Sequence, residues 1–275
     1  MILSLAQAKI EKMKETGADN LHIVSDFDRT LSTDKVDGVR QPTSFGHLSD
    51  EKYLGEYYTS ESKRLFDIYH PIEIDLNISL EEKTKHMDIW WRLILDLLIE
   101  TGLTKQIIED ILQAQPIHLR GDSKQFFHIL ENNNIPLLIL SAGLGDIFTT
   151  HLKQKELITN NVHIISNLFD FDTGGKATKV KYPPIHTTNK NESGIMNSPY
   201  SANVEARDNV IVIGDMIEDL RMVEGLQHNT VLSIGFLNDP DSESRAKYHT
   251  AFDIVFEDEG ALTPVNEIIQ DIISK

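Results

Sequence analysis

The chain has 275 residues with 26 Lys or Arg against 43 Asp or Glu, a net charge of −17, which argues against nucleic-acid binding because such surfaces need positive stripes. No cysteine is present, which excludes disulfides, thiolate nucleophiles and zinc–thiolate sites. Nowhere do 18 apolar residues run together, and the amino-terminal stretch is too charged for a signal peptide, so we expect a soluble cytoplasmic protein without a membrane partner.

The first predicted strand runs from His22 to Ser25 and ends directly before two aspartates, Asp26 and Asp28. Residues two apart on a strand lie on the same face, so both carboxylates leave its end in the same direction. Two like charges held so close repel unless a cation lies between them or one carboxyl keeps its proton. The segment therefore predicts a metal site or an acid/base pair.

Residues 33–120 are predicted to be largely helical. Ser79 and Glu82 have the spacing of a capping box, which predicts a helix through Trp90 and Trp91 to Gly102. A helical insertion placed after the first strand is typical of a lid or cap domain.

Four further apolar runs are predicted to be strands: PLLIL (136–140), VHII (162–165), VIVI (210–213) and VLSIGF (231–236). They are short, rich in β-branched residues and not alternating, as in a parallel sheet that is buried on both faces. Helices are predicted after an Asp122 cap and from Asp146 to Glu156, whereas residues 169–207 are expected to form a hairpin and loop. This alternation predicts an open α/β sheet.

Small or acidic residues follow three of these strands: Asp26 to Thr30 the first, Ser141 the second, and Asp215 with Asp219 the fourth. Because the carboxyl ends of parallel strands lie side by side, we expect these side chains to converge. Mg²⁺ accepts one or two carboxylates and keeps its other positions for water or phosphate oxygens. Asp26 and Asp215 would supply those carboxylates, leaving Asp28 free for proton transfer.

The order D-x-D-x-T, Ser, a later Lys and G-D-x-x-x-D resembles the four motifs of the haloacid dehalogenase superfamily. This resemblance implies a Rossmann-like parallel-sheet core, residues 1–32 and 121–275, with an inserted helical cap domain, residues 33–120. The chain also resembles the cytosolic 5′-nucleotidase III, or pyrimidine 5′-nucleotidase, family. The stretches that carry this likeness are DFDRTLS (26–32), IEID (72–75), EEK (81–83), Trp90-Trp91, SAGLGD (141–146), ISNLFDFD (165–172), NKNE (189–192), GDMIEDLRMVEG (214–225) and IGFLND (234–239).

The resemblance implies a Mg²⁺-dependent 5′-nucleotidase that hydrolyses nucleoside monophosphates. Asp26 would attack phosphorus and form an aspartyl-phosphate, which splits one difficult step into two. Asp28 would protonate the leaving oxygen and then activate water. Mg²⁺ would be held by Asp26, Asp215 and the backbone carbonyl of Asp28. Ser141, Ala142 and Lys190 would bind the phosphate.

The remaining assignments concern supporting residues and the nucleoside. Thr30 and Asp219 are expected behind the metal site, with Asp219 holding the metal's waters or orienting Lys190. By resemblance, Glu73 would meet the base or sugar and Trp91 would stack on the base. Tryptophan at that position is typical of relatives that accept 7-methyl-GMP alongside CMP and UMP. The family also implies phosphoryl transfer to a second nucleoside, and we expect a monomer.

Departures from the family pattern fall at Glu218, which replaces a small residue, and at Phe45, Gly46 and His47, whose roles the sequence does not assign. Ile94 and Leu95 replace polar residues. These differences bear on base preference.

Simpler interpretations remain for several residues. Asp26 and Asp28 could only cap a turn, Ser141 could be a helix N-cap, Lys190 could be a solvated lysine and Trp91 could belong to the core of the cap. For the whole chain, the alternatives are a phosphatase for another small phosphomonoester such as phosphoserine, an inactive scaffold and a calcium-binding module.

Overall fold

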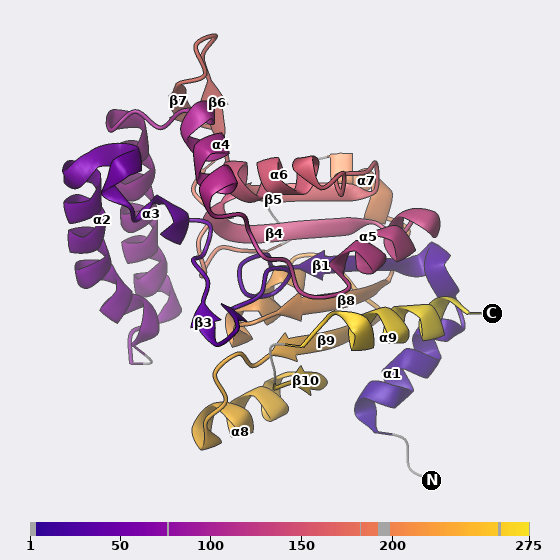
Figure 1. Cartoon of the computed structure of the whole chain (residues 1–275). Coiled ribbons are helices and arrows are strands. Elements are labelled where there is room, and N and C mark those ends of the chain that lie inside the picture. The colour runs from indigo at the N-terminus through magenta and orange to yellow at the C-terminus, as the bar shows by residue number, and fades with distance from the viewer. Residues whose placement is uncertain (1–3, 76, 182, 192–198, 258–259, 275) are drawn as a thin grey trace.

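The computed structural model describes residues 4–75, 77–181, 183–191, 199–257 and 260–274. Glu192, the last residue of the NKNE stretch, lies outside these ranges. The centre of the fold is a six-stranded sheet in the order β10-β9-β8-β1-β4-β5, with every pairing parallel (Figure 1). The strands are β1 (Leu21–Ser25), β4 (Leu137–Leu144), β5 (Val162–Asn167), β8 (Asn209–Gly214), β9 (Thr230–Phe236) and β10 (Ile254–Phe256).

All five predicted strands are confirmed, and their burial explains their composition. Every residue of the central strands β1 and β8 is buried, whereas the edge strand β5 is only partly covered. Alternate residues of one strand enter the two cores, since Ile23 packs on one face of the sheet and Val24 on the other. The sixth strand, β10, was not predicted because it is only three residues long and half-buried.

Helices cover both faces of the sheet (Figure 1). The larger core joins β1, β4 and β8 to α1 (Leu5–Lys14), α5 (Ser123–Asn132), α6 (Gly145–Gln154) and α9 (Thr263–Ile273). The smaller core lies under α7 (Pro199–Val204) and the 3-10 helix η4 (Ile217–Val223). α8 (Ser242–Ala251) has no buried residue. No helix among the described residues is long and apolar enough to cross a bilayer.

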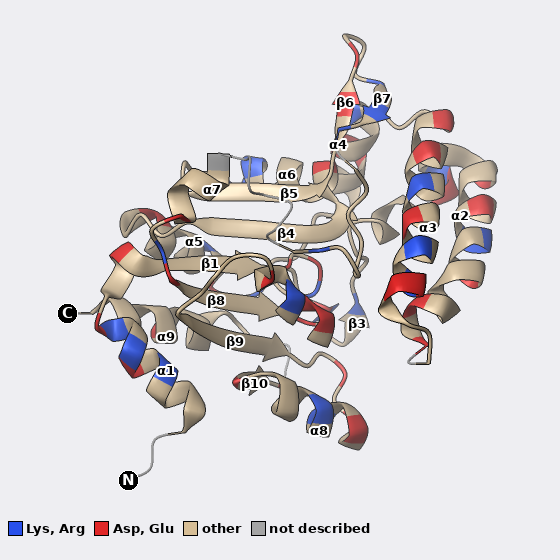
Figure 2. Ribbon diagram, turned by 180° about the vertical axis from the view of Figure 1, so that it is seen from behind, with Lys and Arg blue, Asp and Glu red and all other residues tan. Residues whose placement is uncertain are grey.

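Two long helices, α2 (Glu51–Ile74) and α3 (Leu80–Glu100), stand side by side beyond the carboxyl ends of the strands, and we call them the cap helices (Figure 1). Lys or Arg and Asp or Glu are interspersed along both (Figure 2). The predicted start of α3 is confirmed, because the Ser79 side chain accepts a hydrogen bond from Glu82 N. α4 (Lys105–Ala114) packs against α6 instead. The exact limits of a cap domain stay a prediction.

The other connections agree in part with the expectations. Two antiparallel hairpins are present: β2 (Lys35–Val36) with β3 (Val39–Arg40), and β6 (Phe169–Phe171) with β7 (Ala177–Val180). The predicted hairpin after residue 169 is therefore confirmed, although the same stretch also contains α7. Asp122 is at the N-cap position of α5, as predicted, but its side chain makes no capping hydrogen bond: its φ is a left-handed 61°, and its carboxylate accepts from Thr263 instead.

Candidate active site

The three central strands β8, β1 and β4 bring most of the predicted site residues to one cavity of about 150 Å³, which we call the carboxylate cavity. The strand order reverses at β1: β4 and β5 follow on one side of it, and β8, β9 and β10 are added later on the other side. Ligands of open α/β sheets bind at the carboxyl ends of strands at such a point. The lining residues are Asp26, Asp28, Arg29, Thr43, Ser141, Ala142, Gly143, Thr187, Lys190, Asp215, Met216, Glu218 and Asp219.

A buried lysine lies between two carboxylates in this cavity. The ammonium of Lys190 donates to Asp26 Oδ1 and, over 2.8 Å, to Asp219 Oδ1. The other oxygen of Asp219 accepts from the backbone N–H groups of Asp215 and Met216, at 3.1 and 3.0 Å. Asp219 thus makes the contact with Lys190 that an orienting role requires, and this role, one of the two expected for it, stays a prediction. The alternative interpretation of Lys190 as a solvated surface lysine does not hold, because its side chain is only 5 % exposed.

Three carboxylates crowd together beside this lysine. One oxygen each of Asp26, Asp215 and Asp219 lies within 4.8 Å of the others, and the Thr30 hydroxyl donates to Asp215 over 3.4 Å. Burial raises the pKa of Asp26 to about 7, with further contributions from Asp219 and Asp28 and opposition from Lys190. Burial, Asp26 and Asp219 together raise the pKa of Asp215 well above its usual value. Such crowded negative charge favours a bound cation.

The residues present fit a hard divalent cation. Carboxylate oxygens are the ligands that Mg²⁺ and Ca²⁺ prefer, and Asp26 and Asp215 leave adjacent strands toward the same space. Mg²⁺ uses one or two carboxylates and completes its shell with water and phosphate oxygens, which suits a site that opens into a cavity. Asp219 stands in the cluster where the predicted set has the backbone carbonyl of Asp28.

Asp28 is held by a serine that sequence reasoning missed. Ser44 donates to both carboxylate oxygens, through its backbone N at 2.9 Å and its hydroxyl at 2.6 Å. The hydroxyl oxygen in turn accepts from Leu144 N at 2.9 Å, so its own proton is directed at Asp28. Burial raises the pKa of Asp28, while the two Ser44 bonds oppose the rise. Ser44 lies in the segment after Pro42, where the sequence had no periodicity to interpret.

Two glycines in the predicted motifs permit this close packing. A Cβ at Gly143 would lie 2.2 Å from the Ser44 hydroxyl and 2.6 Å from Asp28 Oδ2. A Cβ at Gly214 would lie 2.4 Å from Asp219 Oδ2. Any side chain at either position would therefore displace a group of the site.

The Ser141-Ala142 segment faces the same cavity and is part of β4. Ser141 Oγ accepts from Gly143 N at 3.1 Å, and the N-cap of α6 is Leu144, so Ser141 is not the helix cap. Asn167, at the end of β5, donates to the Ala142 carbonyl at 2.8 Å. Asn167 was quoted within a family stretch but was given no role. It fixes the backbone at the predicted phosphate-binding position.

A second cavity of about 530 Å³, which we call the aromatic cavity, opens between the cap helices and the segment after Thr43. Trp91 lines it, and the indole N–H donates to the Ala142 carbonyl over 3.3 Å, so the ring joins the two cavities. Phe45 and Ile94 also line it, whereas Leu95 is buried in the core. The full lining is Thr43, Phe45, Gly46, Ser49, Tyr58, Thr59, Ser62, Lys63, Phe66, Trp90, Trp91 and Ile94.

Glu73 lines neither of these two cavities. Its carboxylate accepts from the Thr187 hydroxyl at 2.9 Å and lies 3.1 Å from His70 Nδ1. Thr187 lines the carboxylate cavity, so Glu73 stands directly behind its wall. A contact between Glu73 and the nucleoside stays a prediction.

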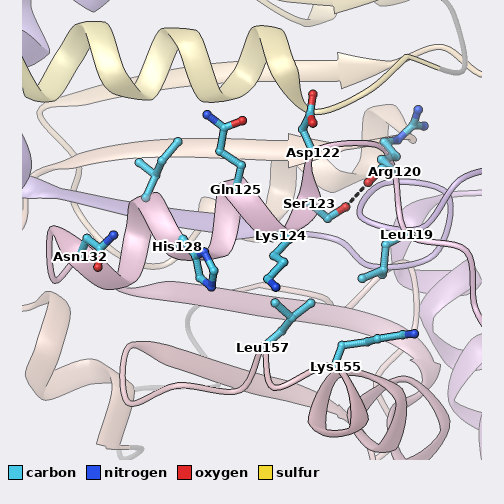
Figure 3. Close-up of a pocket in the computed structure, with 11 residues that line it drawn as sticks. Leu119, Arg120, Asp122, Ser123, Lys124, Gln125, His128, Asn132, Lys155 and Leu157 are labelled. Carbon is cyan, nitrogen blue, oxygen red and sulfur yellow. Dashed lines mark hydrogen bonds between the residues drawn. The ribbon is translucent and has the colours of Figure 1, made fainter.

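Two larger cavities contain little of this chemistry. One, of about 810 Å³, follows α5 and the turn after α6, and Figure 3 shows Lys124, His128 and Lys155 along it but none of the predicted site residues. Another, of about 760 Å³, is lined by Gly46 and His47, and burial lowers the pKa of His47 to about 4. Size alone therefore does not locate the site.

Comparison with known structures defines the class of protein. The fold matches a phospho-aspartyl intermediate analogue of phosphoserine phosphatase with a TM-score of 0.52 and 16 % identity, covering 90 % of this chain and 97 % of that one, which shows a shared fold only. Together with a haloacid dehalogenase family hydrolase among the structural matches, it places the chain in the haloacid dehalogenase fold.

Within that class the family is also defined. Residues 29–273 match the pyrimidine 5′-nucleotidase (UMPH-1) family, and the chain belongs to it. A human relative named 7-methylguanosine phosphate-specific 5′-nucleotidase (Homo sapiens) is 39 % identical over 97 % of this chain and 89 % of its own length. The crystal structure of cytosolic 5′-nucleotidase IIIB bound to cytidine matches with a TM-score of 0.83 and 32 % identity, covering 97 % and 90 % of the two chains. The chain is thus a phosphoric monoester hydrolase of the 5′-nucleotidase type.

Proposed function

We propose that this protein is a Mg²⁺-dependent 5′-nucleotidase that converts CMP, UMP and 7-methyl-GMP to the nucleoside and phosphate through an aspartyl-phosphate. The observation that carries the proposal is the juxtaposition of Asp26, Asp28 and Lys190 in one cavity that adjoins an aromatic cavity through Trp91. The first cavity has the groups for phosphoryl transfer, and the second has a ring face for a base.

In the first half of the reaction, an Asp26 oxygen bonds to phosphorus as the bond from phosphorus to the ribose oxygen breaks. Asp28 gives its proton to that ribose oxygen as the general acid. The raised pKa of Asp28 suits this task, because a buried carboxyl holds its proton nearer to neutral pH. Bound Mg²⁺, on Asp26, Asp215 and the Asp28 carbonyl or Asp219, would supply positive charge to the phosphoryl oxygens.

In the second half, ionised Asp28 takes a proton from a water molecule. The water oxygen bonds to phosphorus as the bond from phosphorus to the Asp26 oxygen breaks, which frees phosphate and restores the Asp26 carboxylate. Ser44 keeps the Asp28 carboxylate aimed through both of its oxygens. Burial alone would lower the pKa of Lys190, but Asp219 and Asp26 raise it, so the ammonium stays charged and can bind phosphoryl oxygens together with the Ser141-Ala142 segment. A second nucleoside in place of water would give the phosphotransfer that the family implies.

Recognition of the base is assigned to the cap, residues 33–120. Stacking on an aromatic ring contributes about 1–3 kcal/mol and tolerates many bases. A cationic base such as 7-methylguanine would add roughly 0.5–2 kcal/mol from the ring's quadrupole. Lys63 is the only charged residue that lines the aromatic cavity among the described residues, and Asp67 lies 2.8 Å from its ammonium. Acceptance of both base types, a monomeric state and a cytoplasmic location are parts of the same proposal.

Release of inorganic phosphate from CMP, UMP, AMP, GMP, 7-methyl-GMP and phosphoserine, with and without Mg²⁺, tests this function. We expect turnover of CMP, UMP and 7-methyl-GMP that stops when the metal is chelated and is absent in Asp26→Asn. Preferential turnover of phosphoserine would instead establish the phosphatase alternative. Activity retained by Asp26→Asn would remove Asp26 as the nucleophile.

A further inference from the structure

The lysine of the active site is carried by a loop, not by a helix or strand. The residues from His186 to Lys190, which we call the lysine loop, form a turn in which His186 N donates to Asn189 Oδ1 at 2.9 Å. A lysine side chain is a flexible four-carbon stem, so the position of its ammonium depends on how firmly the backbone that carries it is held. Whatever fixes the lysine loop therefore bears directly on the position of Lys190.

On the side of the sheet, one residue anchors the start of the loop. Asn167 exchanges two hydrogen bonds with the backbone of Ile185, donating to its carbonyl and accepting from its N–H, both at 2.9 Å. The same side chain donates to Ala142, so the loop is tied to the predicted phosphate-binding segment.

On the opposite side, the cap helices hold the loop at three consecutive residues. His186 Nε2 lies 3.0 Å from Asp88 Oδ1, Thr188 Oγ1 lies 3.0 Å from Thr84 Oγ1, and the Thr187 hydroxyl donates to Glu73. His186 Nδ1 also lies 3.0 Å from Thr188 Oγ1, so the two contacts with α3 share one network. The imidazole is fully buried, and the other group beside Nε2 is the amide nitrogen of Asn189 at 3.0 Å, which cannot accept a hydrogen bond, so loss of the Asp88 acceptor is costly.

The contacting residues of α3 form one face of that helix. Thr84, Asp88 and Trp91 are spaced by four and then three residues, which places them above one another. The Trp91 ring lies 6.0 Å from the His186 ring, centroid to centroid, and also lines the aromatic cavity. The face that holds the lysine loop is thus continuous with the proposed wall of the base site.

We propose that Asp88 and Thr84 are positioning residues, which act on phosphoryl transfer by fixing the lysine loop and, through it, the ammonium of Lys190. Neither residue lines the carboxylate cavity or the aromatic cavity, so neither is assigned a contact with substrate. This proposal rests on the proposed function only in taking Lys190 as a phosphate-binding group. The proposal predicts that substitutions on the cap helices lower the turnover even of a substrate that has no base.

The test compares Asp88→Ala and Asp88→Asn, with Asp96→Asn as a matched control on an exposed part of the same helix. Asp88→Asn keeps an oxygen that accepts from His186, whereas Asp88→Ala removes it. We expect kcat of Asp88→Ala to fall roughly tenfold to a hundredfold for CMP and for para-nitrophenyl phosphate alike, as for a misplaced catalytic group. Asp88→Asn and Asp96→Asn should stay close to the parent protein, and KM should change little.

A purely structural role would lower the melting temperature without this pattern, so kcat is measured well below the melting temperature of each variant. The proposal is overturned if folded Asp88→Ala has the parent's kcat on para-nitrophenyl phosphate, or if only KM for nucleotides rises. Should Asp88→Ala not fold, Thr84→Val provides the same readout, because it removes the contact that Thr188 makes with α3. If the parent hydrolyses para-nitrophenyl phosphate but no nucleotide, the proposed function fails while this test still stands.

Discussion

Replacement of Ser44 by alanine probes the group that orients the proposed acid/base. The variant loses the 2.6 Å hydrogen bond to Asp28 Oδ2 and keeps the backbone bond to Oδ1. A hydrogen bond to a charged group contributes about 1.5–3 kcal/mol, and each 1.36 kcal/mol changes a rate tenfold. Because Asp28 acts in both halves of the reaction, we expect kcat to fall roughly tenfold to a hundredfold with KM nearly unchanged.

Steady-state phosphate release from CMP and from para-nitrophenyl phosphate measures this effect. CMP should lose the full factor and para-nitrophenyl phosphate no more than that, because nitrophenolate leaves with little help from a general acid. The control is Ser60→Ala, which removes an exposed hydroxyl that donates to Tyr57 O on α2. Leu144 N also loses its acceptor in Ser44→Ala, so the melting temperature should fall by several degrees, at about 2–4 °C per kcal/mol. A folded Ser44→Ala variant with kcat within twofold of the parent would refute the orienting role.

Three further predictions concern other residues of the site and the fold. Trp91→Ala should raise KM for nucleotides far more than for para-nitrophenyl phosphate, and equal losses on both would remove the stacking role. Lys190→Ala should cripple turnover while the thermal unfolding transition persists; near-normal turnover would show that another cation serves. Burial raises the pKa of Asp146 from 3.8 to about 6, so its stabilising contribution is complete below pH 4 and is lost as the pH rises through 6. Asp146→Asn should therefore become more stable relative to the parent between pH 4.5 and 7.5, by at most about 3 kcal/mol in denaturant melts, and a difference that does not change with pH would refute the burial argument.

The sequence predicted the parts of the site that depend on buried strands. Apolar runs without alternation have few structures open to them, so the strands before Asp26, Ser141 and Asp215 could be placed, and parallel pairing then brings their ends together. The roles of those residues came from motif resemblance, and the proximity of Lys190 to Asp26 could not have been derived from spacing alone.

The missed residues are polar groups whose partners are distant in sequence. Ser44 reaches Asp28 and Leu144, and Asn167 reaches Ala142 and Ile185, through contacts that leave no periodic pattern. Asp122 has the residue type of a helix cap, but its backbone is left-handed, which composition does not reveal. Tertiary contacts decided each of these cases.

Trapping the covalent intermediate tests the central claim most directly, namely that Asp26 is the nucleophile that attacks phosphorus beside a divalent cation. The enzyme is mixed with radiolabelled nucleoside monophosphate and Mg²⁺, quenched in acid within milliseconds, and digested for mass spectrometry. We predict an acid-stable, hydroxylamine-labile phosphoryl group on the peptide that contains Asp26, absent when Mg²⁺ is chelated. Full turnover with no labelled protein, or with the label on a different residue, would contradict the account.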